Sequence, residues 1–210
     1  MTTSTRPRGM SANRLEAFSD GVFAIAITLL VLELHVPGPD KAGHFSSVLR
    51  HEWASYLAYL ASFFVIGIIW LNHHATIALV HRVTHPIQVL NLGLLLTVSV
   101  LPFPTELLAE ATRDGHRSDQ RVACVIYGLL NALMAVTFNL MFRYIRNHPE
   151  LQKEHVSQEL IQVRYKRFNL GLPAYPIATV VGLFSTTLFF IVIFGLAILY
   201  LLPTPDQDFA

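Results

Sequence analysis

The chain has 210 residues, of which 53% are apolar and 14% charged, and its mean hydropathy is +0.48. Soluble domains usually carry about 25% charged residues, so this composition excludes an ordinary water-soluble globule. The formal net charge of +1 gives no electrostatic basis for nucleic-acid binding, and a single cysteine, Cys124, excludes an intrachain disulfide.

Apolar residues are grouped into stretches that can cross a bilayer, which takes roughly 20 helical residues. The last stretch, 171–202, has no charged residue. As one helix it would be about 48 Å long, against a bilayer core of about 30 Å. We therefore expect two shorter helices with a turn near Gly182–Ser185. The sequence predicts an all-α membrane protein with six transmembrane helices, at approximate residues 14–36, 54–81, 87–107, 119–146, 164–182 and 185–202. They form one transmembrane domain, 13–202, between a disordered N-terminal tail, 1–12, and a C-terminal tail, 203–210.

The basic residues predict how the helices are oriented in the membrane. Lysine and arginine are more frequent in cytoplasmic loops than in external ones. With six spans, ten of the 15 basic residues fall on the side of the N-terminus and five on the other side. Both termini are therefore predicted to be cytoplasmic.

The first predicted helix combines an apolar stripe with an acidic residue. At about 100° per residue, five apolar side chains fall within about 40° of one line. These are Phe18, Ile25, Leu29, Leu32 and Val36. Thr28 lies about 60° from this line, at its edge, and Asp20 lies about 140° from Ile25. Taken alone, the stripe fits contact with lipid or with another helix. A carboxylate near the bilayer is unfavourable unless it is paired or interfacial, so Asp20 is either an interfacial acid or a buried acceptor.

Histidines cluster in and after the second predicted helix. His74, His81 and His85 would share one helix face, which permits a zinc site, but Pro86 disfavours helical geometry at His85. Histidines that hydrogen-bond to neighbouring helices are the favoured interpretation, and we expect no metal and no cofactor.

The prolines of residues 101–105 should end or kink the third helix. The sequence shows no hydrolase, P-loop or dinucleotide-binding motif, so we expect no enzymatic activity.

The first helix, RLEAFSDGVFAIAITLLVLEL, resembles the signature of the transmembrane protein 175 family, the potassium-permeable channels of bacteria and of endolysosomal membranes. The signature Arg/Lys-x-x-x-Phe-Ser-Asp is matched by Arg14, Phe18, Ser19 and Asp20. The segments WLNHH and NLGLLLTVSVLPFPTELL are similar to the second and third helices of that family, whereas the second half of the chain is similar by hydropathy alone. The resemblance implies six helices per repeat. Because the chain has one repeat, it implies the bacterial form, a homotetramer whose first helices line a central pore.

The resemblance also implies roles for individual residues. Ile25 would form the narrowest ring of the pore, with Leu29 and Leu32 forming further apolar rings and Thr28 contributing to cation selectivity. A polar network, in which either histidine of the adjacent pair could take part, would pack the cytoplasmic side. Its members are Arg14, Phe18, Ser19, Asp20, Trp70, His73, His74 and Asn91.

These features predict a potassium-permeable, weakly selective cation channel with a hydrophobic gate, multi-pass in the bacterial inner membrane. Potassium is the expected permeant ion, and sodium, caesium, rubidium and protons are further candidates. The expected partners are other copies of the chain and membrane lipid, without nucleic acid. Two alternatives remain: a cation- or proton-coupled transporter that uses Asp20 or Glu33, and a metal-dependent membrane enzyme at the histidines.

Overall fold

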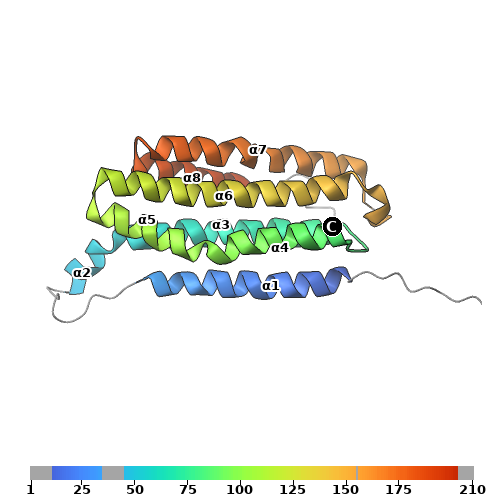
Figure 1. Ribbon diagram of the computed structural model, residues 1–210, viewed down its shortest axis with the longest axis horizontal. Helices are drawn as coiled ribbons and strands as arrows, with labels where there is room; N and C mark the ends of the chain where they lie inside the picture. Colours follow the sequence, from blue (N-terminus) through green and yellow to red (C-terminus); the bar gives the residue numbers. More distant parts are fainter. Residues whose placement is uncertain (1–10, 35–44, 155, 203–210) are drawn as a thin grey trace, which may run out of the picture.

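The computed structural model describes residues 11–34, 45–154 and 156–202, which form a bundle of long helices lying side by side (Figure 1). In chain order these are α1 (Ala12–Leu29), continued by the 3-10 helix η1 (Leu30–Glu33), α2 (Phe45–His51), α3 (Trp53–Ile77), α4 (His85–Val100), α5 (Pro102–Asp114), α6 (Arg117–Arg146), the 3-10 helix η3 (Pro149–Leu151), α7 (Gln158–Gly182) and α8 (Thr186–Leu201). The predicted tails lie almost entirely outside the described residues, as does Val36.

Four helical stretches of the described chain are long and apolar enough to cross a membrane. They are Ala12–Glu33, Trp53–Ile77, His85–Asp114 and Arg117–Arg146. The third stretch contains α4 and α5, which meet at Leu101, so the prolines bend the chain there without ending the helical run. α8 is strongly apolar but has only 16 residues, and α7 precedes it with 25 residues.

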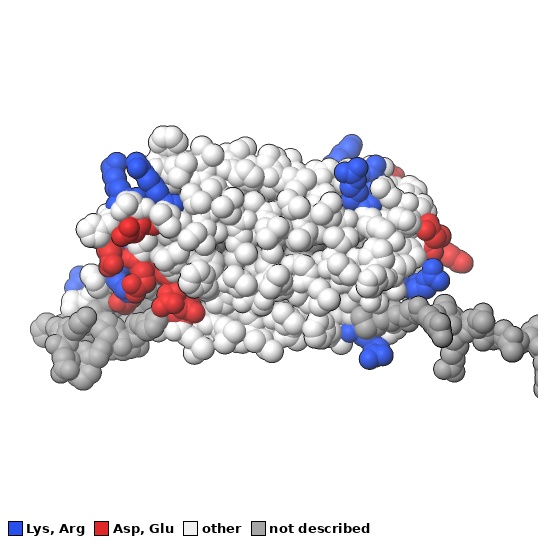
Figure 2. Space-filling model, viewed as in Figure 1, with Lys and Arg blue, Asp and Glu red and all other residues white. Residues whose placement is uncertain are grey.

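Charged side chains gather at the two ends of the bundle and leave an uncharged band between them on the face shown (Figure 2). α1 begins at the same end as the α3–α4 and α6–α7 connections, which we call the N-terminal end (Figure 1). α2, the α5–α6 turn and the α7–α8 turn lie at the opposite end. This distribution matches a bundle whose middle lies in hydrocarbon and whose ends meet water.

Short turns join the helices at the opposite end because the sequence supplies the residues they need. Gly115 ends α5 with φ 78°, in the left-handed region that glycine adopts without strain, and its N–H donates to the carbonyl of Ala111. Ser185 lies before α8, and its hydroxyl accepts a hydrogen bond from the backbone N–H of Leu188. α7 and α8 can therefore pack side by side in antiparallel directions.

Small residues allow α6 and α7 to approach closely. A Cβ atom at Gly128 would collide with the side chain of Thr179, and one at Gly182 would lie 2.7 Å from the Cβ of Cys124. Cys124 itself is fully buried. Close backbone approach through small residues is a common way to pack helices within a membrane, where the solvent is as apolar as the side chains.

At the N-terminal end, two connections pair through their backbones. The N–H of His81 donates to the carbonyl of Leu151 at 3.0 Å, and the N–H of Lys153 donates to the carbonyl of Leu79 at 2.9 Å. This pairing joins the α3–α4 connection to the α6–α7 connection. Because α3 ends at Ile77, the helix face that would have brought His81 into line for a zinc site does not form.

Candidate functional site

α1 packs against α3 and α4 through one face and leaves its other face uncovered in the single chain. The buried face consists of Leu15, Ser19, Phe23 and Ala26, with Leu30 at the start of η1. The uncovered face carries Phe18, Ile25, Leu29 and Leu32, whose exposed fractions range from 41% to 67%. The structure thus brings the described residues of the predicted stripe together on one open apolar surface.

Thr28 lies on the exposed side of α1, close to Ile25. Its hydroxyl group lies 2.9 Å from the backbone carbonyl oxygens of both Ala24 and Ile25, within its own helix. Since the hydroxyl hydrogen points to the backbone, the oxygen's lone pairs remain directed outward. Such an oxygen can accept a hydrogen bond or coordinate a cation.

On the opposite face of α1, a chain of fully buried polar groups joins three helices. The Nδ2 atom of Asn91 on α4 donates to the Ser19 hydroxyl on α1 at 3.0 Å, and that hydroxyl lies 2.8 Å from the carbonyl of Leu15. The Asn91 Oδ1 atom lies 2.7 Å from the Nε2 atom of His73 on α3. Hydrogen bonds in so apolar a setting are strong and directional, so these three side chains fix α1 against α3 and α4.

A second, more exposed set of contacts lies beside this chain. The indole N–H of Trp70 donates to a carboxylate oxygen of Asp20 at 2.9 Å. The Nδ1 atom of His74 lies 2.6 Å from a carboxylate oxygen of Glu16. The two adjacent histidines therefore have different partners: His73 belongs to the buried chain, and His74 pairs with Glu16. Glu16 was missed in the sequence, although it lies four residues before Asp20 and so on the same helix face.

The other two residues of the predicted network lie apart from it. Arg14 is exposed, and within the described ranges it makes no ion pair or hydrogen bond with these side chains. Phe18 is 56% exposed and belongs to the open apolar surface with Ile25.

The described residues also hold no group of three histidine, cysteine, aspartate or glutamate side chains placed to bind a metal ion.

A groove of about 340 Å³ runs between α1 and α3 on the outside of the bundle. Asp20 and Trp70 lie along it, and its remaining lining is mostly apolar: Phe23, Ala24, Ile27, Ile66 and Gly67. An open apolar groove next to the uncovered face of α1 is a surface on which another helix could pack.

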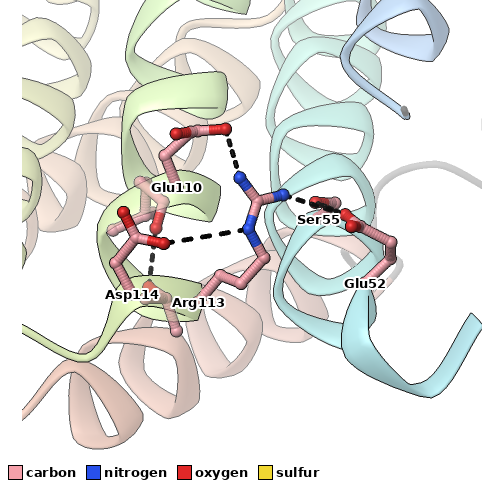
Figure 3. A network of polar contacts seen from close by, with 7 residues as sticks. Glu52, Ser55, Glu110, Arg113 and Asp114 are labelled. Carbon is pink, nitrogen blue, oxygen red and sulfur yellow. Dashed lines mark hydrogen bonds and ion pairs between the residues drawn. The ribbon is translucent and has the colours of Figure 1, made fainter. Parts of the chain in front are cut away.

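The opposite end carries a charged network that the sequence did not single out (Figure 3). Glu52, just before α3, is buried, and its carboxylate accepts from Arg113 Nη1 and from the Ser55 hydroxyl, each at 3.0 Å. Arg113 also pairs with Glu110 and lies 4.0 Å from Asp114. The network ties the start of α3 to the end of α5. The pairing depends on the two helix ends meeting in space, which charge counting along the sequence cannot reveal.

Residues 14–102, which contain most of α1 and all of α3 and α4, match a protein family described as "Endosomal/lysosomal potassium channel TMEM175". A potassium channel of Streptomyces collinus is 38% identical over 203 residues, which cover 95% of this chain and 97% of that protein. The chicken "Endosomal/lysosomal proton channel TMEM175" is 31% identical over 195 residues, covering 86% of this chain and 38% of the chicken protein.

The fold is similar to a solved structure as well. The crystal structure of "a lysosomal potassium-selective channel TMEM175 homolog" from Chamaesiphon minutus superposes with a TM-score of 0.80 at 37% identity. The superposition covers 90% of this chain and 95% of the other. The similarity therefore extends beyond the matched residues 14–102 to the second half of the bundle.

Proposed function

Since this chain belongs to the TMEM175 family of ion channels, we propose that it forms a potassium-permeable, weakly selective cation channel with its pore along α1. Membership of this family confirms the resemblance predicted from the sequence of the first helix. It also favours a channel over an enzyme. The chain is a membrane protein, and its bacterial relatives support placement in a bacterial inner membrane.

The observation that carries the proposal is the division of α1 into two faces. Buried polar side chains hold one face against α3 and α4, while the other presents Ile25, Leu29 and Leu32 without a covering partner in the single chain. One such helix cannot enclose a pore, but several copies around an axis can. We propose a homotetramer in which the groove between α1 and α3 receives part of a neighbouring copy.

Six spans with both termini in the cytoplasm complete this proposal. α7 and α8 would be the fifth and sixth spans, antiparallel to each other across the short Leu183–Ser185 turn. A compartment-sensitive reporter fused to Ala210 should be active only in the cytoplasm, and a reporter active only outside would contradict the six-span arrangement.

Within the tetramer, Ile25 would form the narrowest ring and Leu29 and Leu32 would extend the apolar lining. A narrow apolar ring excludes hydrated ions by dewetting, without a plug or a charge. Thr28 would contribute hydroxyl oxygens near this ring. Weak oxygen ligands favour potassium modestly, because sodium holds its water more strongly.

The polar contacts of α1 would position the pore helix without binding the permeant ion. Asp20 faces Trp70 in the groove between α1 and α3, away from Ile25. This geometry favours a channel over the transporter alternative, in which Asp20 would have to bind and release a coupled ion. The histidine-based enzyme is disfavoured because His73 and His74 contact Asn91 and Glu16.

Purified protein reconstituted in planar bilayers, under opposed potassium and sodium gradients, tests the proposal. We expect unitary currents with a reversal potential displaced toward potassium. A saturable flux that depends strictly on a second ion, without unitary currents, would show a transporter instead. Adding a proton gradient measures whether protons also pass, as the name of the chicken relative suggests for that protein.

A further inference from the structure

Two cavities adjoin at the opposite end of the bundle, on the side of α8. One, of about 320 Å³, lies where α6 begins and where α7 turns into α8. The other, of about 490 Å³, extends along α8 and α3. They share part of their lining, namely Trp53, Thr112, Thr186 and Thr187. A single ligand could therefore occupy both.

The first cavity is basic. Arg117 and Arg121, one helical turn apart at the start of α6, line it together with Gln120 and Ser185, and its lining contains no carboxylate. Arg121 Nε donates to the carbonyl of Leu183 at 2.9 Å, which fixes the guanidinium group in place. Neither arginine has an ion-pair partner within the described residues. Figure 2 shows basic side chains at this end (upper left), above the acidic cluster.

The second cavity is apolar and open to the side of the bundle. Its lining along α8 is formed by Phe190, Ile191, Phe194, Gly195 and Ile198, which cover about 12 Å of helix. Ile191 and Ile198 are exposed, and a Cβ atom added at Gly195 would meet nothing within 4 Å. The groove thus begins beside the basic cavity, where the two share Trp53, Thr112, Thr186 and Thr187, and continues along α8.

We propose that the two cavities form a binding site for one anionic phospholipid. Its phosphate would lie between Arg117 and Arg121, and one acyl chain would lie in the groove along α8. Trp53, 49% exposed at the junction, is placed where indole rings meet the headgroup region. Guanidinium groups bind phosphate oxygens through charge-assisted hydrogen bonds, and the adjoining groove selects a ligand with a hydrocarbon chain over a free anion.

The test uses the full-length protein, purified in detergent and titrated with dioleoyl phosphatidylglycerol or dioleoyl phosphatidylcholine. Native mass spectrometry measures the fraction that carries lipid. We expect the wild type to prefer the anionic lipid. We expect the double variant Arg117→Gln/Arg121→Gln to bind it roughly 25-fold more weakly, about fivefold for each arginine.

The control variant, Arg82→Gln/Arg143→Gln, removes the same charge from exposed positions at the N-terminal end and should retain the wild-type affinity at this site. Equal binding of the two lipids by the wild type would overturn the proposal. An unchanged affinity in the Arg117→Gln/Arg121→Gln variant would overturn it as well.

The groove is tested separately. Gly195→Phe, or the smaller Gly195→Leu if the first variant does not fold, should fill the groove and weaken lipid binding while leaving the subunit number unchanged. Glycerol phosphate, which lacks acyl chains, should bind far more weakly than the lipid. Glycerol phosphate that bound as tightly as the lipid would exclude the groove from the site. A change of subunit number in both Gly195 variants would show that another copy of the chain fills the groove. Tight binding of glycerol phosphate and a changed subunit number would each overturn the proposal.

Discussion

The amide of Asn91 sets the tautomer of His73. Because Asn91 Nδ2 donates to the Ser19 hydroxyl, Oδ1 faces His73 Nε2 at 2.7 Å, and Nε2 must carry the hydrogen. The Nδ1 atom of His73 is then an acceptor, buried and without a hydrogen-bond partner among the described residues. One amide thus determines the positions of side chains on α1 and α3.

Asn91→Leu should destabilise the protein, because it leaves the buried Nε2–H of His73 without an acceptor and removes the N–H donor to the Ser19 hydroxyl. We expect the free energy of unfolding to fall by about 1–3 kcal/mol. Asn72→Leu is the matched control, since Asn72 is only half-buried and donates to Ile68 of its own helix. Thermal unfolding in detergent measures the stability of both variants. Equal losses of stability would show that the network adds nothing beyond local helix contacts.

Asp20→Ala should loosen α1 without changing ion selectivity. The carboxylate is half-buried and accepts from the neutral indole of Trp70, so the expected loss is about 1–3 kcal/mol. This is smaller than the loss on breaking a fully buried ion pair. Asp20→Asn, which keeps an acceptor oxygen, should restore most of the stability. An intact tetramer with altered potassium-to-sodium permeability in either variant would place Asp20 in the ion pathway.

Thr28→Val removes one hydroxyl group with little change in volume. If the Thr28 oxygens contribute to selectivity, the reversal potential under opposed potassium and sodium gradients should shift toward equal permeability. Thr137→Val is the control, because the Thr137 hydroxyl on α6 also lies close to two backbone carbonyls of its own helix. An unshifted reversal potential in Thr28→Val would remove this residue from the selectivity mechanism.

Ile25→Asn should increase the basal current. Asparagine has as many side-chain heavy atoms as isoleucine but would hydrate the proposed ring, so the closed state would lose its dewetted barrier. The control is Ile177→Asn, at an isoleucine of similar exposure on α7. If Ile25 only packs between subunits, the asparagine amide would be buried unsatisfied. The tetramer would then be weakened by about 1–3 kcal/mol without any gain in current.

Glu52→Gln should destabilise the opposite end of the bundle. The substitution keeps the size of the side chain but removes the charge that pairs with Arg113, and the buried carboxylate also accepts from Ser55. We expect a loss of about 1–3 kcal/mol. Glu106→Gln, on the same helix as Arg113 and in none of its ion pairs, is the control. Equal unfolding temperatures for the two variants would argue against a stabilising role for the network.

The sequence predicted the features that depend on helical geometry alone. The 100° step places Ile25, Leu29 and Leu32 on one face, and the structure leaves that face uncovered. The length of the uncharged stretch 171–202 indicated a turn, and the structure has α7 end at Gly182. Features that depend on which helices meet were not predictable. The choice between His73 and His74 is made by Asn91 on α4, and the partner of Glu52 is set by where α5 ends.

The close contact between Cys124 and Gly182 has a consequence for chemical labelling. The chain has one cysteine, which is buried between α6 and α7, so we expect thiol reagents in water or detergent not to react with it in the folded protein. The natural sequence therefore serves as a silent background for maleimide and methanethiosulfonate reagents. A cysteine introduced at Ile25 would be the one reactive thiol, and its oxidation to a dimer would require two α1 helices with Cα atoms within about 7 Å. The packing that holds α6 against α7 would thus allow the distance between α1 helices at the proposed pore axis to be measured without altering any other native residue.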